Sequence, residues 1–65
     1  MELQVGDKFM AERAKTIFVI DEIVEDPIHG TLISSSMEYG QKGYYRDSKE
    51  DFIEFLKEMF AIKIN

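Results

Sequence analysis

The chain has 65 residues, no cysteine, a single histidine and a net charge of −5 at pH 7. This length predicts one domain over residues 1–65, and the composition excludes disulfides, thiolate chemistry and a zinc site built from cysteine and histidine. The excess of acidic residues argues against direct contact with nucleic-acid phosphates and favours a basic protein as a partner. No apolar run is long enough to span a membrane, and no signal peptide precedes the first expected strand, so we expect a soluble, cytoplasmic protein.

Short strands are predicted throughout the N-terminal part of the sequence. Alternating apolar and polar residues predict a lead-in strand over residues 1–5, which ends at a Gly-Asp bend. Residues 8–12 form the next expected strand, with Phe9 and Ala11 on one face. The short polar tip after it indicates an antiparallel hairpin with the strand that follows.

The stretch over residues 16–24 is the expected central strand, because β-branched and aromatic residues dominate it. Its apolar run over residues 17–20 alternates between the two faces, which predicts a core on both sides of this strand. A turn containing Pro27 and Gly30 separates it from a strand over residues 31–39. The odd-numbered residues of that strand are the more apolar set, so we expect them to face the core.

One amphipathic helix is predicted in the C-terminal third of the chain. Asp47 with Glu50, or Ser48 with Asp51, has the spacing of a capping box, so both positions are candidates for the helix start. The helix is expected to end at one of the last two residues of its apolar stripe, and Phe55 lies at the margin of that stripe. The stripe consists of Phe52, Ile53, Leu56, Met59 and Phe60.

A short closing strand over residues 60–64 follows the helix, since apolar and polar residues alternate there. The expected fold is therefore a small α+β domain, an antiparallel sheet of about four or five short strands with one C-terminal helix. The Gly-Asp entry and the strand meander resemble the small SH3-like, partly open barrels. Those barrels usually carry a single 3₁₀ turn before the last strand, where this sequence predicts about three helical turns. The resemblance concerns the fold and implies no function.

No group of residues supports catalysis. Asp21 and Glu22 are adjacent on a predicted strand, so their carboxylates point to opposite faces and do not share a substrate or metal. His29 lies in a predicted turn without a nucleophile or carboxylate motif beside it. Residues 34–36 are serines without the strand–turn–helix context of a nucleophile elbow, and residues 40–43 lack the spacing of a phosphate loop. We expect a non-enzymatic protein with no metal and no cofactor.

The helix carries the first candidate binding surface. Asp47, Asp51, Glu54 and Glu58 recur at i, i+4, i+7 and i+11, which predicts one acidic stripe. Like charges four residues apart repel on a helix, so helix stability does not explain the stripe. The simplest alternative is an ordinary solvated face. The sharper hypothesis is an acidic surface that docks on a basic protein.

The second candidate surface is the hairpin of residues 39–46, whose last part is a predicted strand. Tyr39, Tyr44, Tyr45 and Arg46 bracket its glycine-containing loop. Tyrosine and arginine are enriched at binding hot spots, because they offer a large contact area with a polar end. Tyr44 and Tyr45 are expected on opposite faces of the strand, which leaves one of them exposed. The alternative is an aromatic pair that stabilises the sheet.

These features favour a small acidic interaction protein that docks on a larger basic protein as an inhibitor or adaptor. Phage-encoded inhibitors and host-defence antagonists offer an analogy of size and charge. The alternative is an oligomeric protein that binds a small molecule or nucleotide with the hairpin of residues 39–46. We also expect a homodimer, because Phe60, Ile62 and Ile64 form an apolar edge and a chain this short gains stability from a partner subunit.

Overall fold

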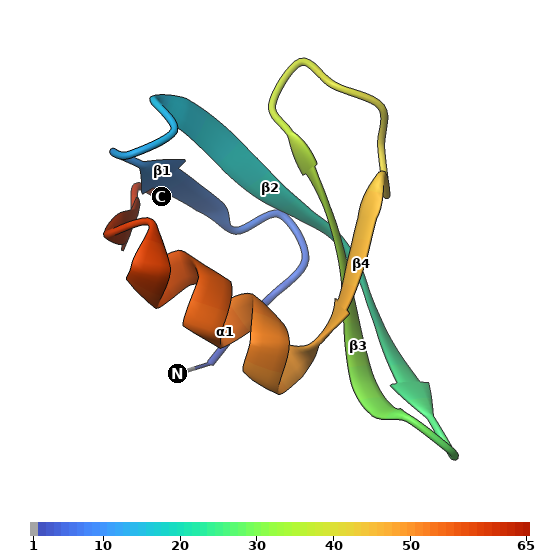
Figure 1. The fold of residues 1–65 in the computed structure, drawn as a ribbon. Coiled ribbons are helices and arrows are strands. Elements are labelled where there is room, and N and C mark those ends of the chain that lie inside the picture. The colour runs from blue at the N-terminus through green and yellow to red at the C-terminus, as the bar shows by residue number, and fades with distance from the viewer. Residues whose placement is uncertain (1) are drawn as a thin grey trace.

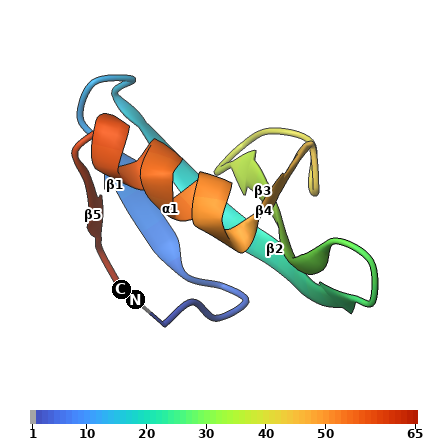
Figure 2. The ribbon, with the colours of Figure 1, turned by 60° about the horizontal axis from the view of Figure 1, so that its bottom comes forward.

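A computed structural model describes residues 2–65 as five strands and one helix (Figure 1). All five strands pair antiparallel in one sheet, in the order β4-β3-β2-β1-β5, and the helix lies across one face of that sheet (Figure 2). The α+β class with an antiparallel sheet is therefore confirmed. The elements are β1 (Lys8–Ala11), β2 (Thr16–Asp26), β3 (Gly30–Met37), β4 (Tyr45–Ser48), α1 (Lys49–Glu58) and β5 (Ala61–Lys63).

The hairpin of β1 and β2 forms as predicted. Phe9 pairs with Phe18, and Ala11 pairs with Thr16. Phe9 and Ala11 are buried on the face that α1 covers, because side chains alternate along a strand and these two are two residues apart.

The predicted lead-in strand is wrong for residues 2–5, which belong to no strand. A tight turn replaces it, in which Gly6 adopts a φ of 93° that residues with a Cβ rarely tolerate. The Asp7 carboxylate accepts the N–H of Gln4 at 2.9 Å, and the N–H of Asp7 donates to the Gln4 carbonyl at 3.0 Å. Turn chemistry thus overrides the apolar alternation. Met1, the first residue of the predicted strand, lies outside the described residues.

β2 is the central strand, as expected, but only one of its faces is fully covered. Phe18 and Ile20 are buried on the face toward α1, and Ile20 is 1% exposed. Ile17 and Val19, on the opposite face, are only half-buried. The predicted core on both sides is therefore wrong, because a single helix covers a single face and, within residues 2–65, no other helix or strand lies on the second face.

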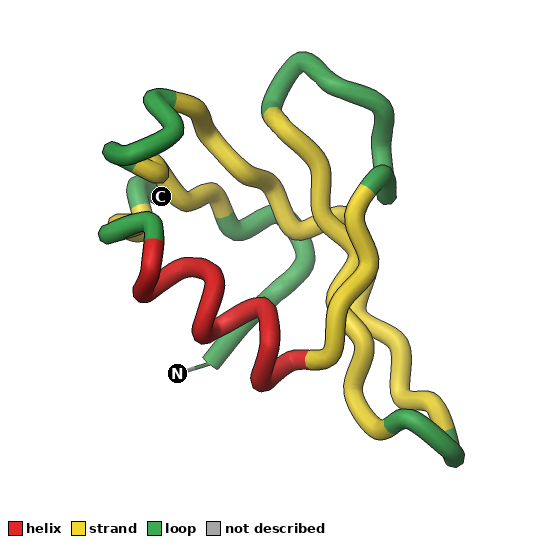
Figure 3. The backbone as a smooth tube through the Cα atoms, in the orientation of Figure 1, coloured by secondary structure: helices red, strands yellow, loops and turns green. Residues whose placement is uncertain are grey.

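β3 also departs in part from its predicted orientation. Ile33 faces the core as expected, and the serines at 34–36 are buried on both faces of the strand. The odd positions of Met37 and Tyr39 predict side chains that face the core, but both residues are exposed. The strand ends at Met37, so Tyr39 belongs to the following loop, where strand alternation no longer applies (Figure 3).

α1 begins at the second of the two capping positions. The Ser48 hydroxyl accepts the N–H of Asp51 at 3.2 Å, which satisfies one unpaired donor of the first turn. Phe52 and Leu56 are the buried residues of the helix, and they share one core cluster with strand residues. Phe60 does not belong to the buried stripe, because the helix ends at Glu58 and Phe60 is exposed with a φ of 51°.

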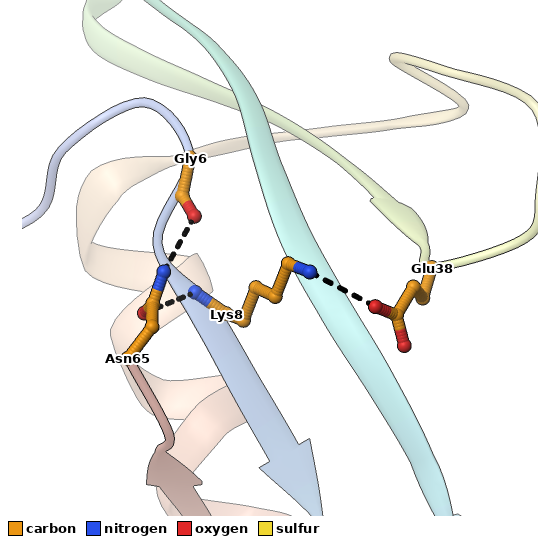
Figure 4. A network of polar contacts seen from close by, with 4 residues as sticks. All are labelled: Gly6, Lys8, Glu38 and Asn65. Carbon is orange, nitrogen blue, oxygen red and sulfur yellow. Dashed lines mark hydrogen bonds and ion pairs between the residues drawn. The ribbon is translucent and has the colours of Figure 1, made fainter.

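The last strand lies at an edge and does not close the sheet. β5 pairs with β1 alone, and within residues 2–65 it makes no pair with β4, so the sheet is open. The end of the chain follows β1: the Asn65 side chain accepts the N–H of Lys8 and donates to the Gly6 carbonyl, both at 3.0 Å (Figure 4).

We predict that Ile20→Ala lowers the free energy of unfolding by about 2–5 kcal/mol, because it opens a cavity under α1. Ile28→Ala makes the same kind of change at the tip of the β2–β3 hairpin, where the side chain is exposed, and should change stability by less than about 0.5 kcal/mol. Chemical denaturation measures both. Equal effects of the two substitutions would contradict the position of Ile20 in the core.

The β2–β3 turn predicts a pH dependence. The N–H groups of His29 and Ile28 donate to the Asp26 carboxylate at 2.9 and 2.7 Å, and these two bonds lower the pKa of Asp26. A carboxyl with a lower pKa in the folded state stabilises the protein above its unfolded-state pKa, and this contribution disappears as the pH falls through the folded-state value. NMR titration should show Asp26 titrating below an ordinary aspartate. Asp26→Asn should remove this part of the acid dependence of stability, and an ordinary pKa for Asp26 would contradict the turn geometry.

Candidate functional site

The two acids of the central strand lie at a β-bulge and have separate partners. The pairing of β2 with β3 shifts between Ile20 and Glu22, which leaves Asp21 without a partner residue. The Asp21 carboxylate accepts the N–H of Gly43 at 2.7 Å, so it holds the β3–β4 loop. The Glu22 carboxylate lies 3.4 Å from the guanidinium of Arg46, two strands away. Both acids therefore hold parts of the fold.

The four residues of the hairpin surface do not converge. Tyr39 is 96% exposed in the loop, and Arg46 donates from Nε to the Ser34 hydroxyl at 3.0 Å on the face away from α1. The prediction that Tyr44 and Tyr45 point apart is wrong, since their rings meet edge to face at 4.8 Å. Tyr44 precedes β4, so alternation along the strand does not govern it. Only Tyr45 lies on the face toward the helix.

A groove opens between α1 and the sheet, beside β4. It encloses about 460 Å³, which is within the usual size range of ligand pockets. Its lining includes the ring of Phe18, which meets Phe55 edge to face at 5.1 Å and Tyr45 edge to face at 6.2 Å. We call it the helix–hairpin groove. The lining residues used below are Phe18, Met37, Tyr45, Asp47, Phe55 and Met59.

The four acidic residues of the predicted stripe are exposed, and three of them, Asp51, Glu54 and Glu58, lie on the helix at i, i+3 and i+7. Asp47 lies on β4, before the helix cap, and among residues 2–65 it is the only charged residue in the lining of the groove. Asp51 and Glu58 lie four residues before and three residues after Phe55, so they neighbour that ring on the helix surface. We call Asp47, Asp51 and Glu58 the acidic rim. Glu54 lies on the outer side of the helix.

The acidic charge of this region is not neutralised within the chain. The exposed residues of α1 are four acids, at 50, 51, 54 and 58, and one base, Lys57. In the described part of the chain, the three ion pairs involve neither these acids nor Asp47. The rim is therefore free to meet positive charge on another molecule.

The apolar walls of the groove are what sequence reasoning missed. The apolar pattern predicts a core position for Phe18, the margin of the helix stripe for Phe55 and the core face of its strand for Met37. A usable signal was present in the helix, because Phe55 and Met59 lie four residues apart and extend the apolar stripe to one side. No local pattern placed that side next to Tyr45.

Residues 2–65 contain no group of three or more metal-ligating side chains, and no helix in them is long and apolar enough to cross a membrane. Comparison of the chain with protein-family models, curated proteins and solved structures finds no match. The groove and its acidic rim are therefore the features of the chain that bear on its function.

We predict that Glu54→Lys raises the free energy of unfolding. The substitution replaces two repulsive i,i+4 pairs, with Glu50 and with Glu58, by attractive pairs, each worth about 0.2–0.5 kcal/mol. Glu54→Gln should give an intermediate value, because it removes the repulsion without adding attraction. Urea denaturation at low ionic strength measures all three proteins. A loss of stability in Glu54→Lys would show that Glu54 serves the fold.

Proposed function

We propose that this protein is a non-enzymatic interaction protein that binds a larger basic protein through the helix–hairpin groove and its acidic rim, as an inhibitor or adaptor. One observation carries the proposal: an apolar groove lined by aromatic rings has a carboxylate, that of Asp47, as the only charged group of its lining within residues 2–65. Two more carboxylates, those of Asp51 and Glu58, neighbour Phe55, one of the residues that line this groove.

The apolar and acidic parts of this surface have different roles in binding. The rings of Phe18, Tyr45 and Phe55 bury a side chain of the partner, and such desolvated pockets carry most of the affinity at protein interfaces. The acidic rim attracts lysine and arginine and rejects acidic partners, and the charge pairs that it forms beside the buried side chain slow dissociation. Because the rim makes no ion pair within residues 2–65, binding a basic segment breaks none.

The general features of the chain support the same class of function. Its 65 residues and net charge of −5 match the size and charge of phage-encoded inhibitors and host-defence antagonists, and we propose a soluble, cytoplasmic protein of this kind. We also propose an SH3-like, partly open barrel as the description of its fold. The last strand, β5, returns to pair with β1 at the edge of the sheet, and this pairing supports that description. A fold of this kind does not by itself indicate a function.

Small-molecule or nucleotide binding is the second candidate, and the volume of the groove favours it. Such a ligand would use Tyr45 and Asp47 together with the helix, whereas Tyr39 and Arg46 lie elsewhere on the molecule. Thermal denaturation with a panel of metabolites and nucleotides tests it, because a ligand at 100 times its Kd stabilises the folded state by about 2.7 kcal/mol.

Two double variants with the same change in net charge test the main proposal. Asp47→Asn with Glu58→Gln removes two of the three charges of the rim, and Glu50→Gln with Glu54→Gln removes two charges from the outer side of the helix. For a basic protein captured from a lysate and then purified, the rim variant should weaken binding by at least about tenfold, with faster dissociation. The outer variant should mainly slow association at low salt.

Association and dissociation rates measured against ionic strength separate the two effects. At high salt the outer variant should bind like the wild type, while the rim variant should stay weak, because its lost contacts lie beside the groove. Identical behaviour of the two variants would show that only the overall charge matters, and the groove would then lose its assigned role.

A further inference from the structure

The face of the sheet opposite α1 carries an apolar row that no other element of residues 2–65 covers. Ile62 pairs with Met10, and Met10 pairs with Ile17, so these three side chains lie side by side across β5, β1 and β2. Met10 and Ile17 are half-buried, whereas Ile62 is 57% exposed. Tyr39 borders a hollow that Met10 and Ile17 also line. We call these four residues the outer patch.

Two ion pairs lie on the face of the sheet that carries the outer patch. The Lys8 side chain crosses β2 and reaches the Glu38 carboxylate at 2.9 Å (Figure 4). Further along the same face, Arg46 pairs with Glu22. The exposed surface of α1 is different, with four acids and one lysine. Because the whole chain carries a charge of −5, two copies repel each other least when the faces that carry these ion pairs meet.

A second copy of this chain is the occupant that size and sequence favour. A 65-residue chain buries only about 60% of its unfolded surface, which leaves it short of core. β2 has apolar side chains on both of its faces, and α1 covers only one of these faces. A two-fold axis through the outer patch would bring the same patch onto itself and cover Ile17 from the second side.

We propose that the protein forms a two-fold homodimer with the outer patch of each copy at its centre. The sequence predicts an apolar C-terminal edge that includes Ile62 and Phe60. Ile62 lies in the outer patch, whereas the ring of Phe60 lies under the Arg13 guanidinium at 5.1 Å. The helix–hairpin groove is on the other face of the sheet. The dimer therefore presents two grooves facing outward, which gives it avidity for a partner that carries two basic segments.

Mass measurement by light scattering or sedimentation tests this proposal on the isolated chain, without any partner. The wild type should have twice the monomer mass at high micromolar concentration. Ile62→Glu should raise the dimer dissociation constant by at least about tenfold, because it places a carboxylate in the apolar centre. Ile28→Glu is the matched control, with the same side-chain change at an exposed site on the far hairpin tip, and it should remain a dimer.

Three results would overturn the proposal: a monomeric wild type, a dimeric Ile62→Glu, or dissociation of both glutamate variants alike. Tyr39→Ser provides a second variant that leaves the core untouched, since this side chain is almost fully exposed, and it should also weaken the dimer. The rim variant Asp47→Asn with Glu58→Gln should dimerise like the wild type. The dimer and the partner-binding groove are therefore tested separately.

Discussion

The packing of one helix against one face of the sheet determines the rest of this structure. Phe52 meets Phe9 edge to face at 6.4 Å, and Leu56 joins Ile20 and Ile33 in the same buried cluster. A two-layer arrangement of this size has one core and two remaining surfaces. The groove lies beside β4 between the helix and the sheet, and the outer patch lies on the uncovered face. The positions of the groove and of the outer patch thus both follow from one packing interaction.

Local patterns were sufficient to predict most of the elements. The β1–β2 hairpin, the central strand and the helix each have a strong periodicity, and the helix cap lies at one of the two expected serine or aspartate positions. The predictions are wrong where a local or tertiary effect is stronger than the apolar periodicity. The Asp7 carboxylate and Gly6 build a turn in place of the lead-in strand, and the second apolar face of β2 has no element to cover it. Periodicity identifies apolar faces, but it does not count the elements available to cover them.

The site was predicted only as separate pieces. Tyr45 and Asp47 came from two different hypotheses, a tyrosine hairpin and an acidic helix, yet both lie on the same short strand and line the same groove. Ser48 joins them to α1, because it is the last residue of β4 and also the helix cap. The third wall, Phe18, is 37 residues before Phe55 in the chain, so its contact with that ring depends on the angle between helix and sheet. No short-range pattern contains that angle.

The central claim is that the partner binds between α1 and β4. Hydrogen exchange of the backbone amides tests it most directly, measured on the free protein and on its complex with a purified basic partner. The account predicts added protection in β4 and along α1, with β5 and the β2–β3 hairpin tip unchanged. Protection confined to β5 and β1, with β4 and α1 exchanging as in the free protein, would contradict it.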